Sequence, residues 1–122
     1  MEIRKSAEDY LEAMLILKEE KGFVRSVDIA DLLDVTKPSV SYATRNLREH
    51  GYINMASDGL ITLTDKGMEI ADRIYTRHKL LTDFFIQIGV DPDIARKDAC
   101  LIEHDLHEET FEALCRHAGV GK

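Results

Sequence analysis

The chain has 122 residues, of which 44% are apolar, and a net charge of −7, which suits one compact unit or a small domain with an appendage. Its longest apolar run, residues 13–17, is far shorter than the roughly 20 residues that span a bilayer, and its N-terminus is polar, so we expect neither a membrane span nor a signal peptide. The acidic balance argues against indiscriminate nucleic-acid binding, and two cysteines without an export signal argue against a disulfide framework. The sequence therefore predicts a cytoplasmic protein with reduced thiols.

The first half of the chain predicts three helices. Their apolar residues recur with the period of a helix over residues 6–20, 27–34 and 39–50. Gly22 ends the first helix and Ser26 opens the second. Pro38 lies near the first turn of the third helix, where a missing N–H costs nothing, and Gly51 follows its end.

The period then changes from helical to alternating. Two short antiparallel strands, 52–56 and 60–64, are predicted on either side of the turn sequence Ser57-Asp58-Gly59. Three further helices are predicted over residues 65–88, 92–105 and 107–117, the first of them capped by Thr64 and weakened locally around Gly67. The expected fold class is mainly α.

Two short helices joined by a tight turn and followed by a hairpin are typical of a winged helix-turn-helix. A major groove admits one α-helix, and the third predicted helix carries hydroxyl and basic side chains on its polar face. Residues 36–56 hold three basic side chains and one acidic side chain, a local charge of +2. The candidate DNA-binding residues are Thr36, Lys37, Pro38, Ser39, Ser41, Tyr42, Arg45 and Arg48.

Each of these assignments has an alternative. Helix-turn-helix cores also serve as protein-interaction modules, and the ring of Tyr42 could pack rather than contact a base. Asp58 at the predicted tip of the wing would repel phosphate, so we assign the wing no strong role on DNA.

The stretch DACLIEH suggests a metal site. Cys100, Glu103 and His104 stand at i, i+3 and i+4, so one helix would present all three to one side. Thiolate, carboxylate and imidazole are all metal ligands, but Cys100 could equally be a small core residue beside two solvated side chains. Candidate partners from other helices are the carboxylate pair Asp9 and Glu12, and His78 in RHKLL.

The chain resembles the metal-dependent transcriptional repressors typified by the diphtheria toxin repressor and the manganese transport regulator. The resembling stretches are EDYLEAMLILKEEKG, VDIADLLDVTKPSVSYATRNLREHGYI, ITLTDKG, RHKLL and DACLIEH, which together cover nearly all of residues 6–112 in the family's order. The resemblance implies a winged helix-turn-helix DNA-binding domain over residues 1–70 and a helical metal-binding and dimerisation domain over residues 71–122. It also implies a homodimer on double-stranded operator DNA, without the SH3-like domain of longer members.

By the same resemblance, the metal ligands are Asp9, Glu12, His78, Cys100, Glu103 and His104. The Asp9–Glu12 pair resembles manganese-sensing members, whereas Cys100 resembles iron-sensing ones, so we expect Fe²⁺ or Mn²⁺, with Co²⁺ and Zn²⁺ possible in vitro. Thr82 and Arg96 stand where iron-sensing members carry ligands of an ancillary site and do not match it. Glu12 and His78 could instead contribute to a two-metal cluster.

Two other functions compete with the repressor. A metallohydrolase could use Glu103 or Glu12 as a base, although no separate base or oxyanion motif is visible. A DNA-binding regulator could instead sense oxidation through Cys100.

Cys115 is expected to pack in the interior of the protein. The apolar residues of the long helix, Leu80, Leu81, Phe84, Phe85 and Ile88, are candidates for the core or for a dimer interface.

Overall fold

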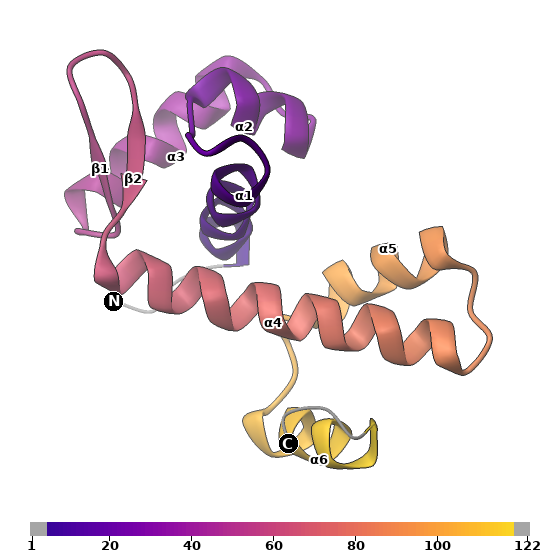
Figure 1. The fold of residues 1–122 in the computed structure, drawn as a ribbon. Helices are drawn as coiled ribbons and strands as arrows, with labels where there is room; N and C mark the ends of the chain where they lie inside the picture. Colours follow the sequence, from indigo (N-terminus) through magenta and orange to yellow (C-terminus); the bar gives the residue numbers. More distant parts are fainter. Residues whose placement is uncertain (1–4, 119–122) are drawn as a thin grey trace. The chain divides into compact units, whose positions relative to one another are not determined.

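The computed structural model describes residues 5–118 and divides into two compact units, the first ending at Asp72 and the second beginning at Arg73. Its elements, labelled in Figure 1, are α1 (Lys5–Lys21), α2 (Ser26–Leu33), α3 (Lys37–Glu49), β1 (Ile53–Met55), β2 (Ile61–Leu63), α4 (Asp65–Gln87), α5 (Pro92–Ile102) and α6 (Glu108–Ala118). The predicted mainly α fold, with one hairpin after the third helix, is confirmed, and the unit boundary falls within α4. None of the described helices combines the length and apolar character that crossing a membrane requires.

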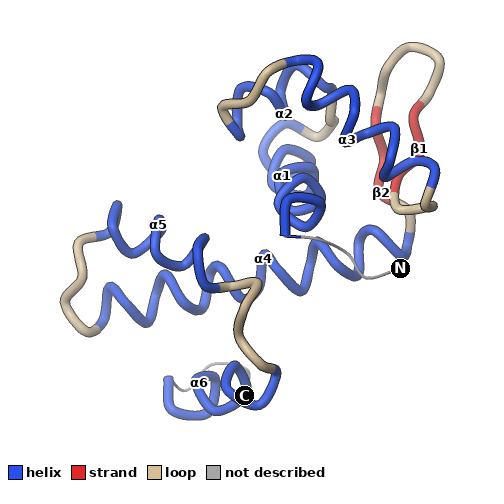
Figure 2. The backbone as a smooth tube through the Cα atoms, turned by 180° about the vertical axis from the view of Figure 1, so that it is seen from behind, coloured by secondary structure: helices blue, strands red, loops and turns tan. Residues whose placement is uncertain are grey.

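The first unit packs α1, α2 and α3 against one another and against the two strands (Figures 1 and 2). Each element contributes an apolar side chain with at most 2% exposure to this core, namely Leu11 and Met14 of α1, Ile29 of α2, Val40 of α3, Ile53 of β1 and Ile61 of β2. Apolar side chains at helical and alternating spacing therefore form this core, as the periods of the sequence predicted. The architecture is a winged helix-turn-helix.

The wing is an antiparallel hairpin in which Ile53 pairs with Leu63 and Met55 with Ile61. Its strands are shorter than predicted. At the start of β1, the Tyr52 N–H bonds to the Leu47 carbonyl at 2.9 Å and so continues the end of α3. A bridge to Val24, through the Ile61 N–H, ties the wing to the segment between α1 and α2.

The glycine near the start of α4 is required by a close approach of the backbone. A Cβ on Gly67 would lie 2.0 Å from the Tyr52 carbonyl oxygen. Thr64 caps this helix as predicted, since its Oγ1 accepts the Gly67 N–H at 3.2 Å. The helix runs from Asp65 to Gln87 as one element, so Gly67 allows two segments to touch rather than interrupting α4.

The second unit has a small core of its own. Leu80 and Leu81 of α4 and Ala99 of α5 are buried in it. The partly buried side chains packed on this cluster are Phe85, Ile102, Leu106, Phe111, Leu114 and Cys115. The predicted packing role of Cys115 is therefore confirmed, whereas Ile88 is 63% exposed.

Two helix boundaries differ from the prediction. Helix α3 begins at Lys37, because Thr36 is its N-cap and accepts the Ser39 N–H. Helix α5 ends at Ile102 instead of about residue 105, with Glu103 as its C-cap. The prediction that one helix carries all three candidate ligands of DACLIEH is thus wrong in detail, since His104 lies in the turn that follows.

Candidate functional site

The exposed face of α3 carries the predicted DNA-binding set. All eight candidates are solvent-exposed: Thr36, Lys37, Pro38, Ser39, Ser41, Tyr42, Arg45 and Arg48. The opposite face buries Val40, Thr44 and Leu47 in the first unit. The helix therefore has one apolar side for the core and one basic and hydroxyl-bearing side open to a partner.

The start of α3 is held by its own hydroxyl groups. The Thr36 and Ser39 side-chain oxygens lie 2.8 Å apart, within hydrogen-bond distance, and Thr36 Oγ1 also accepts the Ser39 N–H at 3.3 Å. Tyr42 is 65% exposed, so the alternative that its ring packs in the core is wrong. Its contact with a base stays a prediction.

An arginine that the sequence analysis did not single out supports the wing. Arg25, just before α2, donates from Nη1 to the Asp58 carbonyl oxygen at 2.8 Å, while the Asp58 carboxylate accepts the Leu60 N–H at 3.1 Å. A cationic side chain thus lies at the tip that Asp58 alone would make acidic. No motif pointed to Arg25, because its partner is a backbone carbonyl 33 residues away.

In the second unit, three predicted ligands, His78, Cys100 and His104, lie near a fourth, the buried carboxylate of Glu103. Glu103 has no exposed surface, and its Oε2 lies 3.0 Å from His78 Nδ1. Its Oε1 lies 3.5 Å from Nε2 of His104, whose side chain is 2% exposed. The Cys100 Sγ and a Glu103 carboxylate oxygen lie within 4.8 Å of each other.

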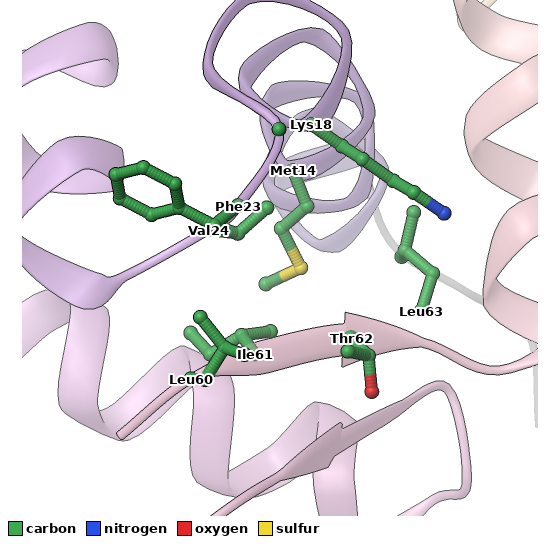
Figure 3. Close-up of a pocket in the computed structure, with 9 residues that line it drawn as sticks. Met14, Lys18, Phe23, Val24, Leu60, Ile61, Thr62 and Leu63 are labelled. Atoms are coloured by element: carbon green, nitrogen blue, oxygen red, sulfur yellow. The ribbon is translucent and has the colours of Figure 1, made fainter. Parts of the chain in front are cut away.

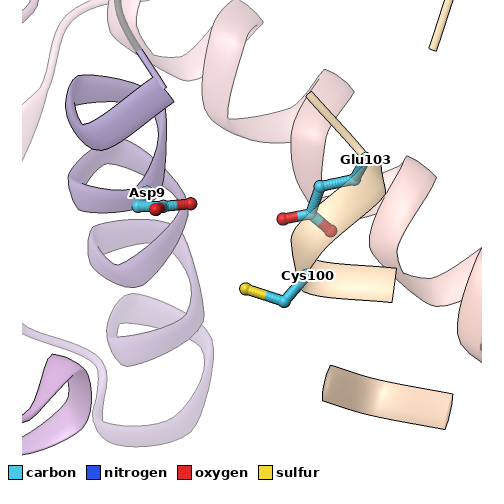
Figure 4. Close-up of side chains that lie close together, drawn as sticks. All are labelled: Asp9, Cys100 and Glu103. Carbon is cyan, nitrogen blue, oxygen red and sulfur yellow. The ribbon is translucent and has the colours of Figure 1, made fainter. Parts of the chain in front are cut away.

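The environment of Cys100 contradicts the reading of a core thiol. Cys100 is exposed, whereas Glu103 three residues later is fully buried. Figure 4 shows both side chains extending from the end of α5 toward the same side, as the i, i+3 spacing predicted. The thiol is therefore accessible and close to the carboxylate.

The remaining two candidates lie in the first unit, on α1. Asp9, drawn in Figure 4, is half-buried, and Glu12, one turn later, is 7% exposed. Glu12 is therefore not an ordinary solvated carboxylate. Burial also raises the pKa of Tyr10, two residues before Glu12.

Imidazole, thiolate and carboxylate, the donor types of these second-unit residues, are those that bind divalent transition-metal ions. His78 Nδ1 and Glu103 Oε2 lie 3.0 Å apart, within hydrogen-bond distance. Within the described part of the chain, Glu103 Oε1 is buried and has no hydrogen-bond partner. A buried carboxylate oxygen in that state is costly unless it binds a cation.

The first unit also has a small surface hollow between the end of α1, the loop after it and β2 (Figure 3). Met14, Val24 and Ile61 contribute to its wall, and Lys18 reaches its edge. None of the predicted DNA-binding or metal-binding residues lines it. The hollow is therefore separate from both candidate sites.

Comparisons with known proteins identify a DNA-binding domain in the first half of the chain and a metal-binding domain in the second half. The model of the iron dependent repressor N-terminal DNA binding domain matches residues 2–60, and that of the iron dependent repressor metal binding and dimerisation domain matches residues 64–120. The chain is 36% identical over 111 residues to an HTH-type transcriptional regulator of Methanocaldococcus jannaschii, covering 89% of both chains. It is also 36% identical to the transcriptional regulator MntR of Escherichia coli, covering 90% of this chain and 71% of that protein.

A solved structure of a manganese-dependent transcriptional repressor in complex with manganese is similar with a TM-score of 0.84 and 27% identity. The match covers 93% of this chain and 52% of the other, so the chain spans about half the length of that repressor. The family consists of transcriptional regulators, which removes the metallohydrolase alternative. The chain belongs to the iron-dependent repressor family of metal-dependent, DNA-binding transcriptional repressors, and it contains that family's DNA-binding domain and its metal-binding and dimerisation domain.

Proposed function

We propose that this chain represses transcription when Fe²⁺ or Mn²⁺ binds to it. Residues 1–70 bind operator DNA through the exposed face of α3, and residues 71–122 supply four of the six metal ligands and form the homodimer. The proposed ligands are Asp9, Glu12, His78, Cys100, Glu103 and His104. The observation that carries the proposal is the buried Glu103 carboxylate, which has His78 Nδ1 at 3.0 Å and His104 Nε2 at 3.5 Å.

The donor types narrow the choice of ion. Carboxylates and imidazoles suit Mn²⁺ and Fe²⁺, whereas a thiolate from Cys100 favours softer or later metals. When bound, the ion supplies the positive charge that offsets the clustered carboxylates. The harder Mn²⁺ depends less on sulfur, so Cys100 is the residue that sets the balance between the two ions.

The proposed ligands come from both units, so metal binding affects the DNA-binding domain as well as the second unit. Asp9 and Glu12 belong to the first unit, and the other four ligands belong to the second. An ion shared between them favours one relation of the units over others, and it shifts the population toward the state that binds DNA. The hydrogen bond between His78 Nδ1 and Glu103 Oε2 orients both side chains, which leaves His78 Nε2 and Glu103 Oε1 for the ion.

A homodimer would present two α3 helices to successive major grooves. Such dimers recognise half-sites about 34–36 Å apart, or one turn of DNA. The second unit exposes large apolar side chains that are available for a partner, among them Ile86, Ile88, Ile94 and Leu101. Leu80 and Leu81, which the sequence left open between core and interface, are buried in the second unit's own core.

A metal titration of DNA affinity tests the proposal. An operator selected from random double-stranded DNA in the presence of Mn²⁺ is labelled, and its affinity for the protein is measured by fluorescence anisotropy. We expect tight binding with Mn²⁺, or with Fe²⁺ under anaerobic conditions, and at least tenfold weaker binding in chelator. Equal affinity in metal and chelator would refute metal activation, and a response to oxidant alone would favour thiol sensing by Cys100.

A further inference from the structure

Two adjacent residues of α4, Arg77 and His78, both contact Glu103. His78 contacts the Glu103 carboxylate, and Arg77 donates from Nη1 to the Glu103 main-chain carbonyl at 3.1 Å. We propose that Arg77 is a positioning residue for the metal ligand Glu103, an inference that rests on the function proposed above. The guanidinium fixes the backbone from which that carboxylate extends.

The contacts of Arg77 cross the whole connection from α5 to α6. Nη1 also donates to the Leu106 carbonyl at 2.9 Å, and Nη2 donates to Glu108 Oε2 at 2.7 Å. The guanidinium carbon lies 5.1 Å from the centre of the Phe111 ring, and the residue is 6% exposed. One buried cation thus holds the end of α5, the turn after it and the start of α6.

The position of these carbonyls explains why they need an external donor. A helix leaves its last carbonyls without helical partners, and α5 ends at Ile102 with Glu103 as its C-cap. A buried carbonyl without a donor costs free energy, and a cation near the C-terminal end of a helix is also favoured by the helix dipole. Arginine suits this place better than lysine, because its planar fork offers several donors in fixed directions.

The consequence concerns the metal ligands themselves. Neighbouring residues of a helix point about 100° apart, so Arg77 and His78 hold Glu103 from two directions. His104, which follows Glu103, lies in the turn that Arg77 restrains through Leu106. Without the guanidinium, the turn gains conformational freedom and the two ligands must be ordered when the ion binds, which weakens the affinity for metal.

The test compares metal affinity with stability in four variants of the full chain. Arg77→Met removes all three donor contacts, and Arg77→Lys keeps the charge without the fork. Glu108→Gln changes only the partner at the exposed end of the network, where the side chain is 62% exposed. Leu114→Ala loosens the core of the second unit and leaves the three hydrogen bonds of Arg77 in place, and so controls for a general loss of stability.

Free Mn²⁺ is measured by electron paramagnetic resonance during titration, and thermal unfolding of each metal-free protein is followed by circular dichroism. We expect Arg77→Met to bind Mn²⁺ about 10- to 100-fold more weakly, Arg77→Lys to lie between it and the wild type, and Glu108→Gln to remain within about threefold. Leu114→Ala should lower the unfolding temperature of the metal-free protein with a change in Mn²⁺ affinity below about threefold.

Three results would overturn the positioning role. They are wild-type affinity in Arg77→Met, an equal loss of affinity in Leu114→Ala at matched stability, and failure of both Arg77 variants to fold, which would make Arg77 a folding residue. Absence of Mn²⁺ and Fe²⁺ binding in the wild type would instead refute the proposed function.

Discussion

Gly67→Ala has two opposing effects on the free energy of unfolding. In an ordinary helix, replacing glycine by alanine adds about 1 kcal/mol of stability, because alanine has the higher helix propensity. In α4 the new Cβ would lie 2.0 Å from the oxygen and 3.0 Å from the carbon of the Tyr52 carbonyl. Both atoms belong to the backbone, so the clash cannot be relieved by turning a side chain.

The size of the effect follows from these contacts. Ordinary contact with a Cβ begins at 3.4 Å, so the two segments must separate by roughly 1.4 Å, and such overpacking costs about 1–3 kcal/mol. The Tyr52 carbonyl also accepts the Thr64 N–H at 3.1 Å, a bond worth about 0.5–1.5 kcal/mol that the movement would strain or break. After the propensity gain of about 1 kcal/mol, we expect a net loss of about 0.5–3.5 kcal/mol.

Urea unfolding followed by circular dichroism measures this change in the free energy of unfolding. The matched control is Glu69→Gly at an exposed position of the same helix, which isolates the propensity effect and should cost about 1 kcal/mol. If Gly67→Ala is as stable as the wild type or more stable, the close approach does not constrain this helix and the reasoning fails.

Three further predictions concern the DNA face, the thiol and a helix cap. Arg45→Ala and Arg48→Ala should weaken operator binding and each flatten its salt dependence by about one unit of slope, as measured by anisotropy over a salt series; unchanged affinity in both would show that this face is misassigned. Cys100→Ser should remove the sulfur-to-metal charge-transfer band of the Co²⁺ protein and Cys115→Ser should keep it, so the reverse pattern would identify the wrong cysteine. Asp91→Ala should lower the free energy of unfolding by about 1 kcal/mol in urea titration, because two backbone N–H groups of α5 lose their acceptor, and an unchanged value would contradict the cap.

The periodicity of the sequence was sufficient for the fold because the core is built from regularly spaced side chains. Val40 and Leu47 of α3, seven residues or about two helical turns apart, are both buried, as the helical period over residues 39–50 predicted. The ends of elements were less predictable, since single hydrogen bonds decide them. Thr36 begins α3 two residues earlier than predicted through its cap, and the Tyr52 N–H, at the start of β1, bonds back to Leu47.

The candidate site was also predictable only in part. Spacing predicted that Cys100 and Glu103 lie on one side of a helix, and they do. It could not predict that one would be exposed and the other fully buried, because burial depends on what other segments cover. The sequence did not predict the role of Arg77, because two of its acceptors are main-chain carbonyls. Every residue has such a carbonyl, so no sequence motif identifies it.

The same contacts bear on the proposal that Glu103 is a metal ligand. Arg77 is the cation next to the Glu103 main chain, but its donors are directed to two carbonyls and to Glu108, not to the Glu103 carboxylate. In the described part of the chain, that carboxylate is in contact with the imidazoles of His78 and His104, which carry charge only when protonated. A buried anion of this kind is costly, and the cost falls when a divalent cation binds. Because a ligand of the folded state adds stability in proportion to RT ln(1 + [L]/Kd), about 2.7 kcal/mol at a hundredfold excess over Kd, an ion at Glu103 would stabilise the unit that holds it while selecting the arrangement that binds DNA.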